Sequence, residues 1–302
     1  MKWLISCLFL LAKARIVSNQ FFGVVYSPYR NGACPTLENI HQDIGLVGPM
    51  AQRIHLYGMD CNQTQMILDT MSELVPRSTA MLGMWVRGEG RFEKELGVLD
   101  KVLAHSKHHS RIDGICVGNE ELYTGSATPA QLIVMLDKVR RLVAQHGLKI
   151  PVFTTDVPNA WTPELAAASD SILANIHPYF DHGSNNPAKN AAVHVMQQYD
   201  ALSARFSSLN KKVVIGETGW PSGGAPLSTS GPATPKLRKS SCTLFYASVT
   251  LATFLITYLK PSTPLGNPLT HMAMLNATLA LQQKGAFHAT CLSNFSLVKP
   301  YI

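Results

Sequence analysis

The chain has 302 residues, of which 46% are hydrophobic and 15% are charged, so it is long enough for one large domain with a sizeable core. All 19 acidic residues lie within residues 1–217, and the net charge of +7 comes mainly from residues 218–302, which hold six basic residues and no acid. Because no basic stripe interleaved with aromatic residues occurs before residue 218, we expect no binding to nucleic acid.

Residues 1–14 have one early positive charge, an apolar centre and the small-residue pattern Ala12-Lys13-Ala14. This pattern is typical of a secretory signal peptide, and the alternative is a buried first strand. Secretion permits disulfides, and Cys34 and Cys61 follow the first two expected strands, so a bond between them is a reasonable expectation. Cys116, inside an expected strand, is predicted to be a small buried hydrophobe.

Apolar runs and helical periodicity alternate along the chain in order. Strands are expected at 22–26, 53–57, 80–86, 112–118, 152–155, 171–176 and 212–216, and helices at 36–47, 62–75, 92–109, 128–145, 163–168 and 188–206. Thr36, Asn62 and Thr162 are expected to cap three of these helices, and Pro129 to open a fourth. Strict alternation predicts parallel strands, in a (β/α)₈ barrel without its last unit or in an open doubly wound sheet.

Glycine-rich phosphate-binding motifs are absent from the sequence, so we expect neither a dinucleotide nor another cofactor. His105, His108 and His109 have a spacing that suits a metal, but with Lys107 among them they are predicted to form a solvated helix face. We therefore expect no metal site.

Two glutamates stand at the ends of expected strands, Glu120 after the fourth and Glu217 after the seventh. Strand ends of a parallel barrel meet at one rim, so two residues 97 positions apart in sequence are expected to be close in space. Glycosidic hydrolysis uses such a pair, one carboxyl as proton donor and the other as nucleophile, about 5–5.5 Å apart in retaining enzymes.

At these residues the sequence resembles glycoside hydrolase family 17, the β-1,3-glucanase family, whose fold is a (β/α)₈ barrel. The resemblance covers roughly residues 22–222 and is nearest to the fungal cell-wall branch. It rests on the stretches 117–120 (VGNE) and 216–222 (GETGWPS), and on 23–29, 56–63 and 175–181.

The resemblance implies a secreted, monomeric cell-wall enzyme that acts on β-1,3-glucan. Within it, Glu217 would be the nucleophile and Glu120, rather than the adjacent Glu121, the acid/base. The substrate-binding residues it implies are Asn119, Tyr57, His177, Tyr179 and Trp220. Each aromatic residue among these could equally serve ordinary packing. A glucanosyltransferase with the same mechanism is a close alternative.

The sequence departs from the family in two places. His55 stands where the family usually has an arginine, which removes a permanent charge near Tyr57 and leaves an inactive glucan-binding wall protein as an alternative. Residues 223–302 show no recognisable eighth strand, so the barrel is expected to be incomplete at its C-terminus. This tail is interpreted as a frame-shifted segment, and its apolar run 240–259 leaves a membrane span as the other interpretation. Sequons begin at Asn62, Asn276 and Asn294, as in a glycoprotein.

Overall fold

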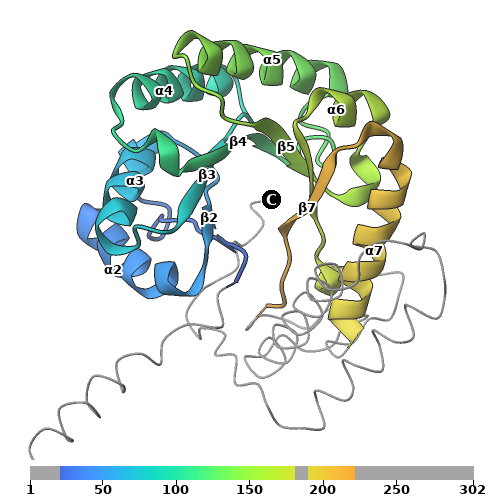
Figure 1. Ribbon diagram of the computed structural model, residues 1–302, viewed down its shortest axis with the longest axis horizontal. Helices are drawn as coiled ribbons and strands as arrows, with labels where there is room; N and C mark the ends of the chain where they lie inside the picture. The colour runs from blue at the N-terminus through green and yellow to red at the C-terminus, as the bar shows by residue number, and fades with distance from the viewer. Residues whose placement is uncertain (1–20, 181–189, 222–302) are drawn as a thin grey trace, which may run out of the picture. The chain divides into compact units, whose positions relative to one another are not determined.

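The computed structural model describes residues 21–180 and 190–221. Seven parallel strands alternate with helices, and the strand order in the sheet follows the chain order from β1 to β7 (Figure 1). A doubly wound sheet would reverse its order at a switch point, whereas a (β/α)₈ barrel adds each strand beside the last. The fold is therefore an incomplete (β/α)₈ barrel, and β7 is the last strand within the described residues.

The described chain divides into two compact units. The first holds the residues up to Ile115 together with His146–Ile150, and the second holds Cys116–Gln145 and the residues from Pro151 onward. The first unit contains β1 (Val24–Val25), α2 (Leu37–Val47), β2 (Arg53–His55), α3 (Gln63–Leu74), β3 (Thr79–Met84) and α4 (Arg91–His105). Strand β4 (Ile112–Asn119) begins in the first unit, and its last four residues belong to the second.

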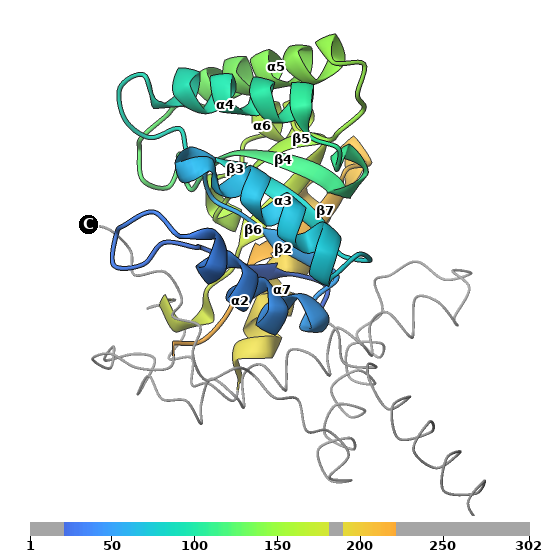
Figure 2. The same ribbon diagram turned by 90° about the vertical axis from the view of Figure 1, so that its left-hand side faces the viewer.

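The buried residues of α2, Ile40, Ile44 and Val47, recur along one face of the helix, as its amphipathic sequence predicts. Helices α2 and α3 pack against each other, as the two views in Figures 1 and 2 show. Thr36 caps α2 as predicted, through a reciprocal capping box with Asn39. Arg53 and Thr79 both donate to Asp113, which joins the first residues of β2 and β3 to β4.

Two loops of the first unit are joined by the predicted disulfide, Cys34–Cys61, with Cα atoms 5.5 Å apart. The expectation that Asn62 caps the next helix was wrong. Cys61 and Asn62 are both left-handed, with φ of 57° and 55°, and the Asn62 side chain makes no capping hydrogen bond. An N-cap residue needs extended backbone angles, so this conformation turns the side chain away from the helix.

The second unit contains α5 (Pro129–Gln145), β5 (Val152–Asp156), α6 (Pro163–Ala168), β6 (Ser171–Asn175), α7 (Ala191–Arg205) and β7 (Lys212–Glu217). Pro129 opens α5 and Thr162 caps α6, both as predicted. The buried residues of α5, Leu132, Leu136, Val139 and Val143, recur every three or four positions along one face. Helix α6 packs against α5, and α7 packs along β7 (Figure 1).

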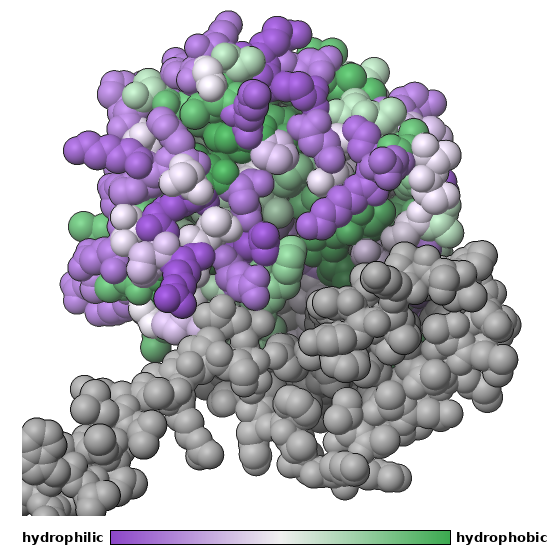
Figure 3. Space-filling view, viewed as in Figure 1, coloured by the Kyte–Doolittle hydropathy of each residue, from purple (hydrophilic) through white to green (hydrophobic). Residues whose placement is uncertain are grey.

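On the face drawn in Figure 3, hydrophilic side chains predominate over the described surface, with apolar ones visible between them. Cys116 is buried, as expected for a residue in β4. Within residues 21–180 and 190–221, no helix combines the length and apolar character needed to cross a membrane. The signal peptide at 1–14, the tail 223–302 and its apolar run 240–259 lie outside the described residues.

Candidate active site

The two predicted carboxylates belong to the second unit and lie on either side of one β6 residue, Asn175. Its backbone pairs with Glu217 across the β6–β7 ladder, and the Ile176 N–H donates to the Glu217 carbonyl at 2.8 Å. Its side-chain Nδ2 donates to Glu120 Oε1 at 3.1 Å. Thus Asn175 contacts both residues, and the structure brings Glu120 and Glu217 to the same edge of the sheet.

A β-bulge sets the direction of Glu217. The β6–β7 register runs Ala174↔Ile215 and then Asn175↔Glu217, so Gly216 is an extra residue on β7. Bulges re-aim a side chain and are over-represented next to active sites. Here the bulge leaves Glu217 at the end of the strand with a side chain that is 12% exposed.

Glycine is the residue that the bulge requires. A Cβ at position 216 would lie 2.6 Å from Thr155 Oγ1 and 2.8 Å from Asn175 Oδ1. These two atoms form a hydrogen bond of 2.7 Å with each other, since the Thr155 hydroxyl donates to the Asn175 amide oxygen. That bond leaves Asn175 Nδ2 to face Glu120 and Asn119 Oδ1, each at 3.1 Å.

Substituting Gly216→Ala is therefore expected to displace the Thr155–Asn175 pair, lower stability by about 1–3 kcal/mol and reduce any glycosidase activity. The matched control is Gly97→Ala. Gly97 lies in α4 with open space around its Cβ position, so alanine there is expected to stabilise by about 0.5–1 kcal/mol. Urea unfolding of both variants measures the two free energies. Equal stability of the two variants would contradict the packing argument.

Glu120 stands in a turn whose backbone is uncommon for a glutamate. Its φ is 58°, in the left-handed region. Its N–H donates to the Thr155 carbonyl at 3.0 Å, and its own carbonyl accepts from the Thr124 N–H and hydroxyl at 3.0 and 2.7 Å. The neighbouring Glu121 is 1% exposed, and its Oε1 accepts the Asn119 N–H at 3.3 Å. The two adjacent acids therefore have different surroundings, and Glu121 points into the protein.

One acid at this edge was not singled out from the sequence. Asp156 ends β5, is fully buried, and accepts backbone N–H groups from Leu122 (2.9 Å), Tyr123 (3.3 Å) and Val157 (2.8 Å). Burial raises its pKa to about 6, the three N–H donors oppose that rise, and the charge of Glu120 adds to it. Its position after a β-branched and aromatic run was the available signal, since Glu120 and Glu217 occupy equivalent positions.

His177 lies beside the second carboxylate. Its Nε2 is 3.4 Å from Glu217 Oε2, and its ring meets Phe180 edge-on at 6.1 Å. The imidazole therefore lies within contact distance of the Glu217 carboxylate. Burial raises the pKa of the Cys116 thiol, and the negative charge of Glu217 raises it further.

Replacing His177 by glutamine is expected to shift kcat/KM for a β-1,3-glucan downward, because the ring nitrogen 3.4 Å from Glu217 Oε2 is replaced by a flexible amide. His146→Gln is the control, since His146 makes a comparable pair with Asp100 at 2.7 Å in the first unit. A shift of the same size in both variants would argue against a specific role for His177.

The aromatic residues predicted to bind substrate divide between the units. Tyr179 and Trp220 pack edge-on at 5.1 Å in the second unit, and they are 5% and 0% exposed. Tyr57 lies in the first unit, where its ring stacks on His55 at 5.5 Å, as expected for two residues on one side of a strand. Packing thus accounts for a part of each residue's environment, and a contact with glucan stays a prediction for all three.

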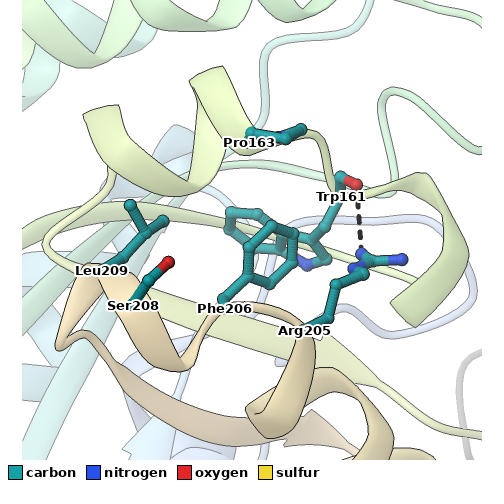
Figure 4. A pocket seen from close by; sticks show the side chains of 6 residues that line it. All are labelled: Trp161, Pro163, Arg205, Phe206, Ser208 and Leu209. Carbon is teal, nitrogen blue, oxygen red and sulfur yellow. Dashed lines mark hydrogen bonds between the residues drawn. The ribbon is translucent and has the colours of Figure 1, made fainter.

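A separate hollow of about 390 Å³ lies in the second unit between the loop before α6 and the end of α7 (Figure 4). Arg205 donates there to the carbonyls of Pro158 (2.8 Å) and Trp161 (3.1 Å), and its guanidinium lies over the Phe206 ring at 4.5 Å. The residues that line the hollow are Trp161, Pro163, Arg205, Phe206, Ser208 and Leu209. Because no acid is among them, the two-carboxylate chemistry belongs elsewhere, at the strand ends.

Comparison with known proteins identifies the family of this chain. Residues 23–257 match the family described as the BtgE/BtgC glycoside hydrolase domain. A probable glucan endo-1,3-beta-glucosidase btgC from Aspergillus terreus is 33% identical over 196 residues, which is 63% of this chain and 30% of that protein. The glucan endo-1,3-beta-glucosidase btgC of Emericella nidulans is 31% identical over 68% of this chain and 33% of its own length. The chain thus spans about a third of the curated relatives that it matches.

Solved structures extend the comparison. A glycoside hydrolase family 17 beta-1,3-glucanosyltransferase from Rhizomucor miehei superposes with a TM-score of 0.69 at 30% identity, over 77% of this chain and 84% of that one. A β-D-glucuronidase from Dictyoglomus thermophilum, 15% identical with a TM-score of 0.54 over 80% of this chain and 44% of that one, shares the fold alone. The chain therefore belongs to glycoside hydrolase family 17, and within it to the BtgE/BtgC glycoside hydrolase family.

Proposed function

We propose that this protein hydrolyses β-1,3-glucan by a retaining double displacement. Glu217 is the nucleophile that attacks the anomeric carbon, and Glu120 first protonates the leaving oxygen and then activates water. The proposal rests on one observation: Asn175 pairs through its backbone with Glu217 and donates through its side chain to Glu120, so both acids lie beside the same residue. Asn119, at the end of β4, would bind the sugar 2-hydroxyl, with Tyr57, His177, Tyr179 and Trp220 as further glucan contacts.

The surroundings of the two acids suit their different tasks. His177 lies beside Glu217, whereas Glu120 accepts a hydrogen bond from Asn175 and its charge raises the pKa of buried Asp156. A pair of carboxyls with opposite protonation states is what glycoside cleavage needs. We extend the proposal to the setting, a monomer secreted to a cell wall, on the ground of the fungal relatives and the Cys34–Cys61 disulfide.

Glucanosyl transfer is the second candidate, because the Rhizomucor miehei relative is named as a beta-1,3-glucanosyltransferase, and an active-site mutant of it was crystallised with laminaritriose. Both reactions form the same glycosyl-enzyme ester and differ in whether water or a second sugar accepts the glycosyl unit. Transfer would yield oligosaccharides longer than the starting laminari-oligosaccharide.

Laminarin is the substrate that tests the proposal. Reducing sugar should be released by the full chain and not by Glu217→Gln, and proton NMR of the first product should show the β-anomer. Chromatography of products from a defined laminari-oligosaccharide separates hydrolysis from transfer. Binding of laminarin without any product would support a glucan-binding protein instead, and release of the α-anomer would exclude the retaining mechanism.

A further inference from the structure

Asp156 connects β5 to the turn that carries Glu120. Its carboxylate accepts the N–H groups of Leu122 and Tyr123, which follow Glu120 by two and three residues, and that of Val157, the residue directly after β5. The side chain is fully buried, so these contacts replace water around a carboxylate. One acid therefore joins the end of β5 to the residues directly after Glu120.

The turn needs such support because Glu120 has a left-handed backbone with φ of 58°. A non-glycine residue keeps this conformation only when its surroundings impose it. The Glu120 N–H donates to the Thr155 carbonyl at 3.0 Å, and the Thr124 N–H donates to the Glu120 carbonyl at 3.0 Å. Asp156 adds a further restraint, since its carboxylate accepts the two N–H groups that lie between those contacts along the chain.

We propose that Asp156 is a positioning residue for Glu120: by holding the 120–124 turn to the end of β5, it aims the Glu120 carboxyl at the glycosidic oxygen. The inference rests on the proposed function, in which Glu120 is the acid/base. Asp156 itself takes its hydrogen bonds from backbone amides and has no assigned contact with substrate. Its effect on the reaction is therefore expected through Glu120.

The substitution Asp156→Asn tests this role, because asparagine keeps the shape but turns one acceptor oxygen into a donor and removes the charge. Asp170→Asn is the matched control. Asp170 accepts the Val152 N–H at 2.7 Å and pairs with Arg140 at 3.4 Å, so its substitution weakens a carboxylate–backbone contact at the opposite end of the same strand. Circular dichroism and thermal melting establish that each variant is folded.

On laminarin, kcat of Asp156→Asn is expected to fall roughly 10- to 100-fold with little change in KM, as for impaired general acid catalysis. The substrate 2,4-dinitrophenyl β-laminaribioside has a leaving group that departs without a proton. On this substrate the loss of kcat should be several-fold smaller. The alkaline limb of the pH profile should move to lower pH, since a negative charge near Glu120 is gone. Equal losses on both substrates, or Asp170→Asn behaving like Asp156→Asn, would overturn the proposal.

Two further measurements cover the cases in which activity is uninformative. If Asp156→Asn does not fold, Asp156→Glu keeps the charge but displaces the carboxylate, and the same dependence on leaving group is expected. Independently of turnover, ¹³C NMR titration of the Glu120 carboxyl, assigned with Glu120→Gln, should show a lower midpoint in Asp156→Asn and no change in Asp170→Asn. An inactive wild type would refute the proposed function, whereas an active wild type with equal losses on the two substrates in folded Asp156→Asn would refute the inference.

Discussion

Replacement of Glu217 by alanine is expected to reduce kcat/KM on laminarin by roughly three orders of magnitude or more, because no carboxylate remains to form the glycosyl ester. Glu217 ends β7 beside the Gly216 bulge, so the truncation removes the attacking group and leaves the ladder in place. The free energy of unfolding should change little. Reducing-sugar release and urea unfolding measure the two effects separately.

Added azide makes the Glu217 experiment specific for a nucleophile. In Glu217→Ala, azide can occupy the vacated position, attack an activated β-glucoside from the opposite face and yield the α-glycosyl azide. Glu89→Ala, a change of an exposed glutamate, is the control and should leave activity unaltered. A β-glycosyl azide, or wild-type activity in Glu217→Ala, would remove Glu217 from the role of nucleophile.

Replacement of Glu120 by alanine is expected to lower kcat/KM on laminarin by about 10²- to 10⁴-fold, the usual contribution of general acid catalysis. The loss should nearly vanish in the first step with a 2,4-dinitrophenyl leaving group, which departs without a proton. Azide then attacks the glycosyl ester of Glu217 from the face that water would use, so the β-glycosyl azide is expected.

Glu121 provides the matched control for Glu120. It is the next residue, but its side chain is 1% exposed and accepts the Asn119 N–H. Glu121→Gln should therefore destabilise the protein and lower activity equally for all leaving groups. A dependence on leaving group in Glu121→Gln, and none in Glu120→Ala, would exchange the roles of the two residues.

Local sequence patterns were sufficient to predict most elements of the fold. The helix expected at 163–168 is α6 (Pro163–Ala168), because Thr162 and Pro163 provide the cap and the first turn, and other boundaries differ by a few residues. These features depend on neighbours in sequence. The Cys34–Cys61 bond was also predictable, since both cysteines follow strands that end at one rim.

The parts of the site that escaped prediction depend on contacts between distant segments. The bulge at Gly216 packs against the hydrogen-bonded pair of Thr155 and Asn175, and β5 contacts the left-handed turn at Glu120. Asn62 failed as a cap for a similar reason, because Cys61 is cross-linked to Cys34 and their loop takes left-handed angles. No periodicity in the chain encodes these three arrangements.

The close fit of Gly216 against Thr155 and Asn175 has a consequence for how this protein can evolve. A side chain at position 216 would collide with both the Thr155 hydroxyl and the Asn175 amide oxygen, whereas loss of the hydroxyl alone frees the Asn175 amide to rotate away from Glu120. Each single change is therefore expected to lower stability or activity, and changes at the three positions are expected not to be additive. Relatives that differ from this chain at one of the three positions are therefore expected to differ at the other two, so positions 155, 175 and 216 should co-vary.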